Sequence, residues 1–211
     1  MIYYPGEADV VIGAEVLNAE TAMYILIGKD RSHYDRSTLV ADHYENALIS
    51  VFPSPDSCLH VLDGRSVEMP GLMDNSLLAT VADKSDIGRI ITNAPAVTIP
   101  AFMGKELQHD WCFSYQKMSL ARQQGDWVEV ARLADEAIAK GFSPEDYSEW
   151  MPVLEAYASL GREKEARHLS TIIRSRDETR FFLCREMQKE PAYPAPFNAQ
   201  LVKDLVCGVK E

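Results

Sequence analysis

The sequence predicts a chain of the α+β or α/β class, with a small α/β part at residues 1–100 and an all-α array of helical hairpins at residues 101–190. Short β-rich runs give way to helical periodicity across residues 93–104, which contain two prolines and form the expected domain linker. A pattern of helix, glycine turn and second helix then occurs twice. A proline-rich strap and a terminal helix are expected at residues 191–211.

The two copies of the helical pattern are related by their turn glycines. Gly125 and Gly161 lie 36 residues apart, and at this offset Leu133 falls on Leu169. A tetratricopeptide (TPR) repeat has a period of about 34 residues and the same plan of two helices. The pattern therefore predicts a TPR-like helical module. Since about three repeats are usually needed for stability, we expect a third helical segment at residues 177–189 and the N-terminal half to pack against it.

Turn and cap residues predict where these helices end. Gly125 can take the left-handed conformation that closes a helix, and Asp126 can cap the next one. Gly141 is expected to end that second helix. Pro152 is tolerated near a helix start if Ser148 is the cap, because first-turn amides lack intrahelical acceptors.

The spacing of apolar residues predicts which side chains pack between helices. One stripe has the spacing of a helix face that needs a partner: Leu133, Ala134, Ala137 and Ile138. The positions expected to be buried are Leu133, Ala137, Leu154, Tyr157, Ala166 and Leu169. A last helix is expected to follow the cap residue Asn198 and to reach Cys207.

Local signals in the first hundred residues predict short elements. Strands are expected at residues 9–16, 47–52 and 59–62. Residues 19–27 fit a helix through their alanines and Met23 or a strand through residues 24–27, and we favour the helix. A short helix is expected at residues 76–82, and Ser85 can cap another that runs through residue 91. Residues 30–46 are polar and predict a loop.

Composition and charge limit the classes of partner. The chain has 46% hydrophobic and 25% charged residues, which is ordinary for a globular protein, and a formal net charge of −11. Residues 1–100 carry 6 basic and 14 acidic side chains, so the acidity lies mainly in this part. Nucleic-acid binding needs clustered Lys and Arg, so no nucleic-acid partner is expected. No apolar run has the length of a membrane span, so no membrane insertion by this segment is expected, and no signal peptide is visible.

A search for catalytic and metal-binding patterns gives only weak candidates. No histidine pair has helix-face spacing and no Cys-x-x-Cys is present, so neither a metal nor an organic cofactor is expected. A polar cluster could bind a divalent ion if a loop gathered it, or could simply face solvent: His33, Asp35, Asp42, His43 and Glu45. Cys58 has His60 two residues on, which places both on one face of a strand. This pair permits a Cys/His nucleophile, and the alternative is a small apolar residue at the start of a buried strand.

The three tryptophans all fall in the helical module. Trp111, Trp127 and Trp150 could line an aromatic groove for a peptide or partner helix. Alternatively, they could wedge between stacked helices. They are therefore candidate partner-binding residues, with core packing as the alternative.

Three stretches of the sequence together resemble a bacterial family: residues 55–63, 110–127 and 143–150. The strongest motif is the run with Trp-Cys, Leu-Ala-Arg-Gln and Gly-Asp-Trp within residues 110–127. These stretches are similar to soluble C-terminal tails of polytopic membrane proteins of the dolichyl-phosphate-mannose glycosyltransferase type. The resemblance implies an extracytoplasmic domain of a longer chain, whose partner is a protein or its own membrane-embedded part. It implies no catalytic residue here, because the glycosyltransferase chemistry belongs to the membrane-embedded part.

The resemblance also bears on the cysteines. An extracytoplasmic location permits disulfides, and Cys112 and Cys184 bracket the repeats beside aromatic residues. We expect these two cysteines to form a bridge, and two buried free thiols are the alternative. Cys207 is expected to be a free thiol.

Three functions follow from these observations. The first is a non-enzymatic accessory or protein-interaction domain outside the cytoplasm. The second is a hydrolase or sugar-processing enzyme that uses acidic residues, histidines and Cys58 of the N-terminal half. The third is a cytosolic TPR-type adaptor. The absence of catalytic motifs favours the first and the third.

Overall fold

The computed structural model describes residues 31–35, 38–42, 48–63, 80–90, 109–187 and 198–208, together with the helical residues Met23 and Leu26. Within these ranges the chain is mainly helical, with short antiparallel strands, and residues 109–187 contain no strand. The α+β class with an all-α part is therefore confirmed. The strand predicted at residues 9–16, the linker at 93–104 and the proline-rich strap at 191–196 lie outside the described residues.

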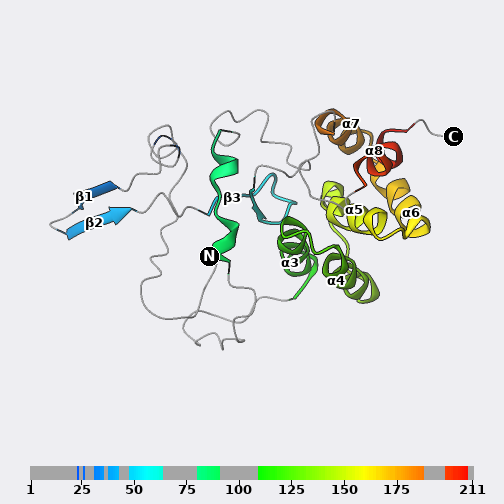
Figure 1. The fold of residues 1–211 in the computed structure, drawn as a ribbon, viewed down its shortest axis with the longest axis horizontal. Helices are drawn as coiled ribbons and strands as arrows, with labels where there is room; N and C mark the ends of the chain where they lie inside the picture. Colours follow the sequence, from blue (N-terminus) through cyan, green and yellow to red (C-terminus); the bar gives the residue numbers. More distant parts are fainter. Residues whose placement is uncertain are drawn as a thin grey trace.

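The helical part consists of α3 (Trp111–Gln123), α4 (Trp127–Ala139), α5 (Met151–Ser159), α6 (Glu163–Arg174), α7 (Asp177–Glu186) and α8 (Ala199–Cys207). Each helix from α3 to α8 packs on the next one along the chain, and α8 also contacts α5 and α6. Figure 1 shows these helices gathered into one body, with the segment of β3 (Ser50–Val51) beside α3. The predicted helical segment at residues 177–189 is thus present as α7.

The helix ends follow the predicted turn residues. Gly125, Gly141 and Gly161 have φ angles of 77°, 79° and 72°, a region where residues with a Cβ are strained. Each glycine N–H bonds a carbonyl three residues back, and the following N–H reaches five residues back, as in Asp126 N to Ala121 O at 2.9 Å. This is the Schellman pattern of helix termination.

Side-chain caps also match the predictions at two helix starts. The Asp126 side chain accepts a hydrogen bond from Glu129 N at 3.0 Å, and Asn198 accepts one from Leu201 N at 3.2 Å. The prediction that Ser148 caps the helix containing Pro152 is wrong. Asp146 instead caps the 3-10 helix η6 (Tyr147–Trp150), and α5 then starts with Pro152 in its first turn.

The buried face of α4 differs from the predicted stripe. Ile138 is 43% exposed and Leu133 is only partly buried, whereas Ala131 is 4% exposed. The reason is that α4 contacts both α3 and α5, so its buried face is centred between these two neighbours. The other five predicted core positions are buried: Ala137, Leu154, Tyr157, Ala166 and Leu169.

Two strand pairs lie in the N-terminal part. β3 (Ser50–Val51) pairs antiparallel with β4 (His60–Val61), so both predicted strands are present but shorter than expected. β1 (Arg31–Asp35) and β2 (Thr38–Asp42) form an antiparallel hairpin where we predicted a loop. That prediction was wrong because a two-stranded hairpin needs few buried apolar side chains. A polar composition therefore does not distinguish such a hairpin from a loop.

The segment at residues 80–90 contains two 3-10 helices rather than the predicted helix through residue 91. They are η3 (Ala82–Lys84) and η4 (Ile87–Arg89). Ser85 does not cap η4, because its Oγ accepts a hydrogen bond from Ile49 N at 3.0 Å instead. Val81 and Ala82 are buried, so this segment packs beside β3 and contributes to the core.

Candidate functional site

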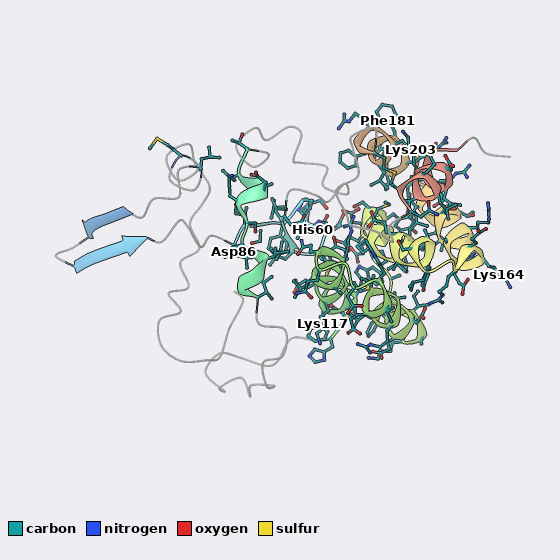
Figure 2. The ribbon with its side chains drawn as sticks, viewed as in Figure 1. His60, Asp86, Lys117, Lys164, Phe181 and Lys203 are labelled. Atoms are coloured by element: carbon teal, nitrogen blue, oxygen red, sulfur yellow. A yellow bond between two sulfur atoms is a disulfide. The ribbon has the colours of Figure 1, made fainter. Side chains whose placement is uncertain are left out.

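Several buried polar groups lie together where residues 48–63 meet the helices. Five side chains form it, and we call them the junction cluster: Cys58, His60, Trp111, Tyr115 and Glu149. They come from three separate parts of the chain, namely the β3–β4 segment, α3 and η6. Figure 2 shows His60 at the boundary between the β segment and the helices.

Glu149 is the centre of this cluster. Its side chain is fully buried, and its carboxylate accepts hydrogen bonds from Trp111 Nε1 at 2.8 Å and from Cys58 N at 2.5 Å. His60 Nε2 lies 3.3 Å from the same carboxylate. A buried carboxylate is costly unless donors surround it, and here an indole, a backbone amide and an imidazole supply them.

His60 connects Glu149 to Tyr115. The imidazole is 2% exposed, its Nδ1 lies 3.3 Å from the Tyr115 hydroxyl, and the two rings are 4.9 Å apart. A neutral imidazole with its proton on Nε2 satisfies both contacts: it donates to Glu149 and accepts from the hydroxyl. The cluster is thus a continuous hydrogen-bonded chain from α3 through β4 to η6.

A disulfide crosses the same junction and corrects our cysteine predictions. Cys58 is bonded to Cys112, and Cys184 is bonded to Cys207. The predicted Cys112–Cys184 bridge is therefore wrong, and so is the prediction of a free thiol at Cys207. The physical reason is that the start of α3 faces residues 48–63, while α7 packs on α8. Four cysteines allow three pairings, which sequence spacing alone does not distinguish.

Cys58, considered above as a nucleophile paired with His60, is not a free thiol in this structure. Cys58 is 2% exposed and is held in the disulfide with Cys112. It lies just before β4, as expected for a small residue at the start of a buried strand.

The three tryptophans pack in the core. Trp111, Trp127 and Trp150 are 5%, 3% and 6% exposed. The rings of Trp111 and Trp150 meet edge to face with centroids 4.6 Å apart. Their positions match the alternative in which they wedge between helices, and none of them presents a surface for a partner.

A second buried polar contact joins α3 to α5. Arg122 and Glu155 form an ion pair with Nε–Oε2 at 2.6 Å and Nη2–Oε1 at 2.9 Å. Next to it along α3, Gln123 donates from Nε2 to Val61 O at 2.7 Å, which holds β4 against the helix. These contacts orient the helices that carry the junction cluster.

A polar network on the surface joins the two helical hairpins. Asp135 accepts hydrogen bonds from the Tyr157 hydroxyl and from Arg162 Nη1, each at 2.7 Å, and the Arg162 guanidinium lies over the Tyr157 ring. Burial acts to raise the pKa of Asp135, but the hydrogen bonds from Arg162 and Tyr157 outweigh it and hold the pKa below its ordinary value. Burial, with the neighbouring Asp135, raises the pKa of Tyr157.

The metal and membrane predictions concern only part of the described chain. The structure does not describe the side chains of the predicted polar cluster around His33 and Asp35. Among the side chains that it does describe, no group of three could hold a metal ion. Within the described ranges, no helix has both the length and the apolar character for crossing a membrane.

Sequence reasoning missed Glu149, Arg122 and Glu155. Glu149 is flanked by Ser148 and Trp150 in a 3-10 helix, where the periodicity of an α-helix gives no sign that a carboxylate faces inward.

Comparison with known proteins adds no identification: no family model matches this sequence, and no curated protein or solved structure matches it.

Proposed function

We propose that this chain is a non-catalytic accessory or protein-interaction domain that works outside the cytoplasm as part of a larger membrane protein. The observation that carries the proposal is the pair of disulfides, Cys58–Cys112 and Cys184–Cys207, which leaves all four cysteines oxidised. Such full oxidation is typical of proteins in oxidising compartments and rare in the cytosol. It therefore favours this function over a cytosolic adaptor.

The proposed interaction role rests on interpreting the helices as a TPR-like array. Support comes from the repeated α3–α4 and α5–α6 hairpins, each closed at a positive-φ glycine. The offset of 36 residues between Gly125 and Gly161 is close to the TPR period. Stacked helical hairpins usually serve as binding surfaces rather than as catalytic frameworks.

The partner that we propose is the membrane-embedded part of the full-length chain. The support is the resemblance of residues 110–127 and 143–150 to glycosyltransferase-associated tails. The runner-up, an enzyme that uses Cys58, loses its nucleophile to the disulfide. The junction cluster is then a structural staple that joins residues 48–63 to the helices.

The test of location is protease shaving of source cells. Protease is added to intact spheroplasts, and the domain is detected with an antibody to residues 109–187. We expect the domain to be digested without lysis, while a cytosolic marker protein stays intact. Protection of the domain until the cells are lysed would refute the extracytoplasmic proposal.

A second experiment tests the partner. The domain is expressed in full-length protein with a photo-crosslinking residue at one of two exposed positions, in place of Phe181 or in place of Lys164. Digestion and mass spectrometry then locate the crosslinked peptides. Crosslinks from either position to a membrane-spanning peptide of the same chain support the proposal. Crosslinks confined to other proteins would refute it.

A further inference from the structure

The two sulfurs of the Cys58–Cys112 bridge differ in accessibility. Cys58 is 2% exposed, whereas Cys112 is only partly buried. Disulfide exchange proceeds by attack of an external thiolate on one sulfur while the other leaves. Cys112 is therefore the more accessible cysteine of this bridge, and attack on its sulfur makes Cys58 the leaving group.

The two sulfurs also differ in electrostatic environment. Cys112 is the second residue of α3, where the unpaired amides of a helix N-terminus favour a thiolate. Cys58 Sγ lies 3.1 Å from Glu149 Oε2. A disulfide sulfur has no hydrogen to donate, so this contact becomes a hydrogen bond only after reduction. A carboxylate at that distance favours the protonated thiol of Cys58 over its thiolate.

From the difference in accessibility we propose that Cys58–Cys112 is a thiol–disulfide exchange site for external thiol compounds, with Cys112 as the attacked sulfur and Glu149 as the hydrogen-bond acceptor that stabilises the released Cys58 thiol. This goes beyond the proposed interaction function and does not depend on it.

The exchange balances with a thiol as the only co-reactant. An external thiolate attacks Cys112 Sγ, a new S–S bond forms to it, and the Cys58–Cys112 bond breaks. The electron pair goes to Cys58, which takes up from solvent the proton that the external thiol lost on ionising, and the resulting thiol donates to the Glu149 carboxylate. A second thiolate then attacks the external sulfur of the mixed disulfide, which releases Cys112 as a thiolate and the oxidised reagent. Two electrons pass from the thiols to the cysteine pair.

Neighbouring groups hold the Glu149 carboxylate in place as the acceptor. His60 Nε2 lies 3.3 Å from Oε1, and its Nδ1 lies 3.3 Å from the Tyr115 hydroxyl. At the start of η6, Asp146 accepts a hydrogen bond from Ser57, and Arg176 lies over the Tyr147 ring at 5.0 Å. Among these groups, His60 is the one in contact with the Glu149 carboxylate itself, so it helps to fix the position of the acceptor.

The second bridge is the internal control. Cys184 is the eighth residue of α7 and Cys207 is the last residue of α8, so neither lies at a helix N-terminus. Both cysteines are partly buried, so their accessibility is similar. For this pair we therefore expect no preference for which of the two sulfurs is attacked.

The first test uses the full chain with one free thiol at a time. Cys58→Ser and Cys112→Ser variants are incubated with glutathione disulfide at pH 7, and mass spectrometry follows the mixed disulfide. We expect Cys112 in the first variant to react at least tenfold faster than Cys58 in the second. Equal rates, or faster reaction at Cys58, would overturn the assignment. In unmutated protein, reduction by glutathione should place the transient mixed disulfide on Cys112, which tests the same point if a variant does not fold.

The second test addresses Glu149. Thiolate absorbance at 240 nm is titrated from pH 5 to pH 9, below the range where tyrosine ionises at about 10. In Cys112→Ser protein we expect the Cys58 thiol to titrate above the ordinary cysteine value of about 8.5, and adding Glu149→Gln to move the midpoint back towards it. Adding Glu149→Gln to Cys58→Ser should change the Cys112 midpoint less. A Cys58 midpoint that does not respond to Glu149→Gln would overturn the role of the carboxyl.

Discussion

Arg122 on α3 and Glu155 on α5 form a two-point ion pair inside the helical body, with side chains 0% and 2% exposed. Desolvating two charges is costly, and the attraction between them offsets this cost only while both are present. The pair therefore fixes how α3 lies against α5, and its effect on stability depends on whether one or both partners are removed.

The first prediction concerns this pair. Glu155→Leu should lower the free energy of unfolding by about 3–5 kcal/mol, because it removes the Glu155 carboxylate from the buried Arg122 guanidinium. Arg122→Met combined with Glu155→Leu should recover most of that loss. Urea unfolding monitored by circular dichroism measures both. A double variant as unstable as the single one would contradict this account.

The second prediction concerns the apolar core between the hairpins. Leu154 is 0% exposed, so Leu154→Ala should cost about 2–4 kcal/mol through lost burial and the cavity left behind. Ile138→Ala is the matched control, because Ile138 is 43% exposed and its substitution should change stability by about 0.5 kcal/mol or less. Thermal and urea unfolding of both proteins gives the comparison. Similar losses from the two variants would argue against this packing.

The third prediction concerns the disulfides. The bridges span 54 residues for Cys58–Cys112 and 23 residues for Cys184–Cys207. In the chain-entropy model, replacing both cysteines of a bridge by serine should cost about 4 kcal/mol for the longer loop and about 3 kcal/mol for the shorter one. Urea unfolding of the two double variants measures these losses. Full stability after removal of both bridges would contradict a structural contribution.

The fourth prediction concerns pH. The pKa of Asp135 is lower in the folded state than in an unfolded chain, despite the opposing effect of burial, because Arg162 and Tyr157 bond its carboxylate. The unfolded state therefore binds more protons in this window, and stability rises with pH. The contribution of Asp135 is present above the ordinary carboxyl pKa of about 3.9 and is lost as pH falls through its folded pKa.

Asp135→Asn should therefore flatten the fall in stability between about pH 5 and pH 2. Melting temperatures across this range, measured for the variant and the parent protein, check it. Glu145→Gln removes an exposed carboxylate and is the control, and it should leave the slope closer to that of the parent. A slope unchanged by Asp135→Asn would contradict the role of this network.

The confirmed predictions concern local features, which depend on residues only a few positions apart. Gly125, Gly141 and Gly161 close helices because they adopt positive φ, and Asp126 and Asn198 cap helices through their own side chains. These effects act between residues a few positions apart, so spacing in the sequence is enough to predict them.

The tertiary structure alone decided the features that need distant parts of the chain. The partner of Cys112 is Cys58 rather than Cys184, and Glu149 is buried because donors from α3 and residues 48–63 converge on it. Similarly, α4 buries Ala131 and exposes Ile138 because it lies between α3 and α5. The sequence by itself determined the helix ends at Gly125, Gly141 and Gly161 and the caps at Asp126 and Asn198. The pairing of cysteines and the burial of charge depend on which elements meet in space, a relation that local spacing does not encode.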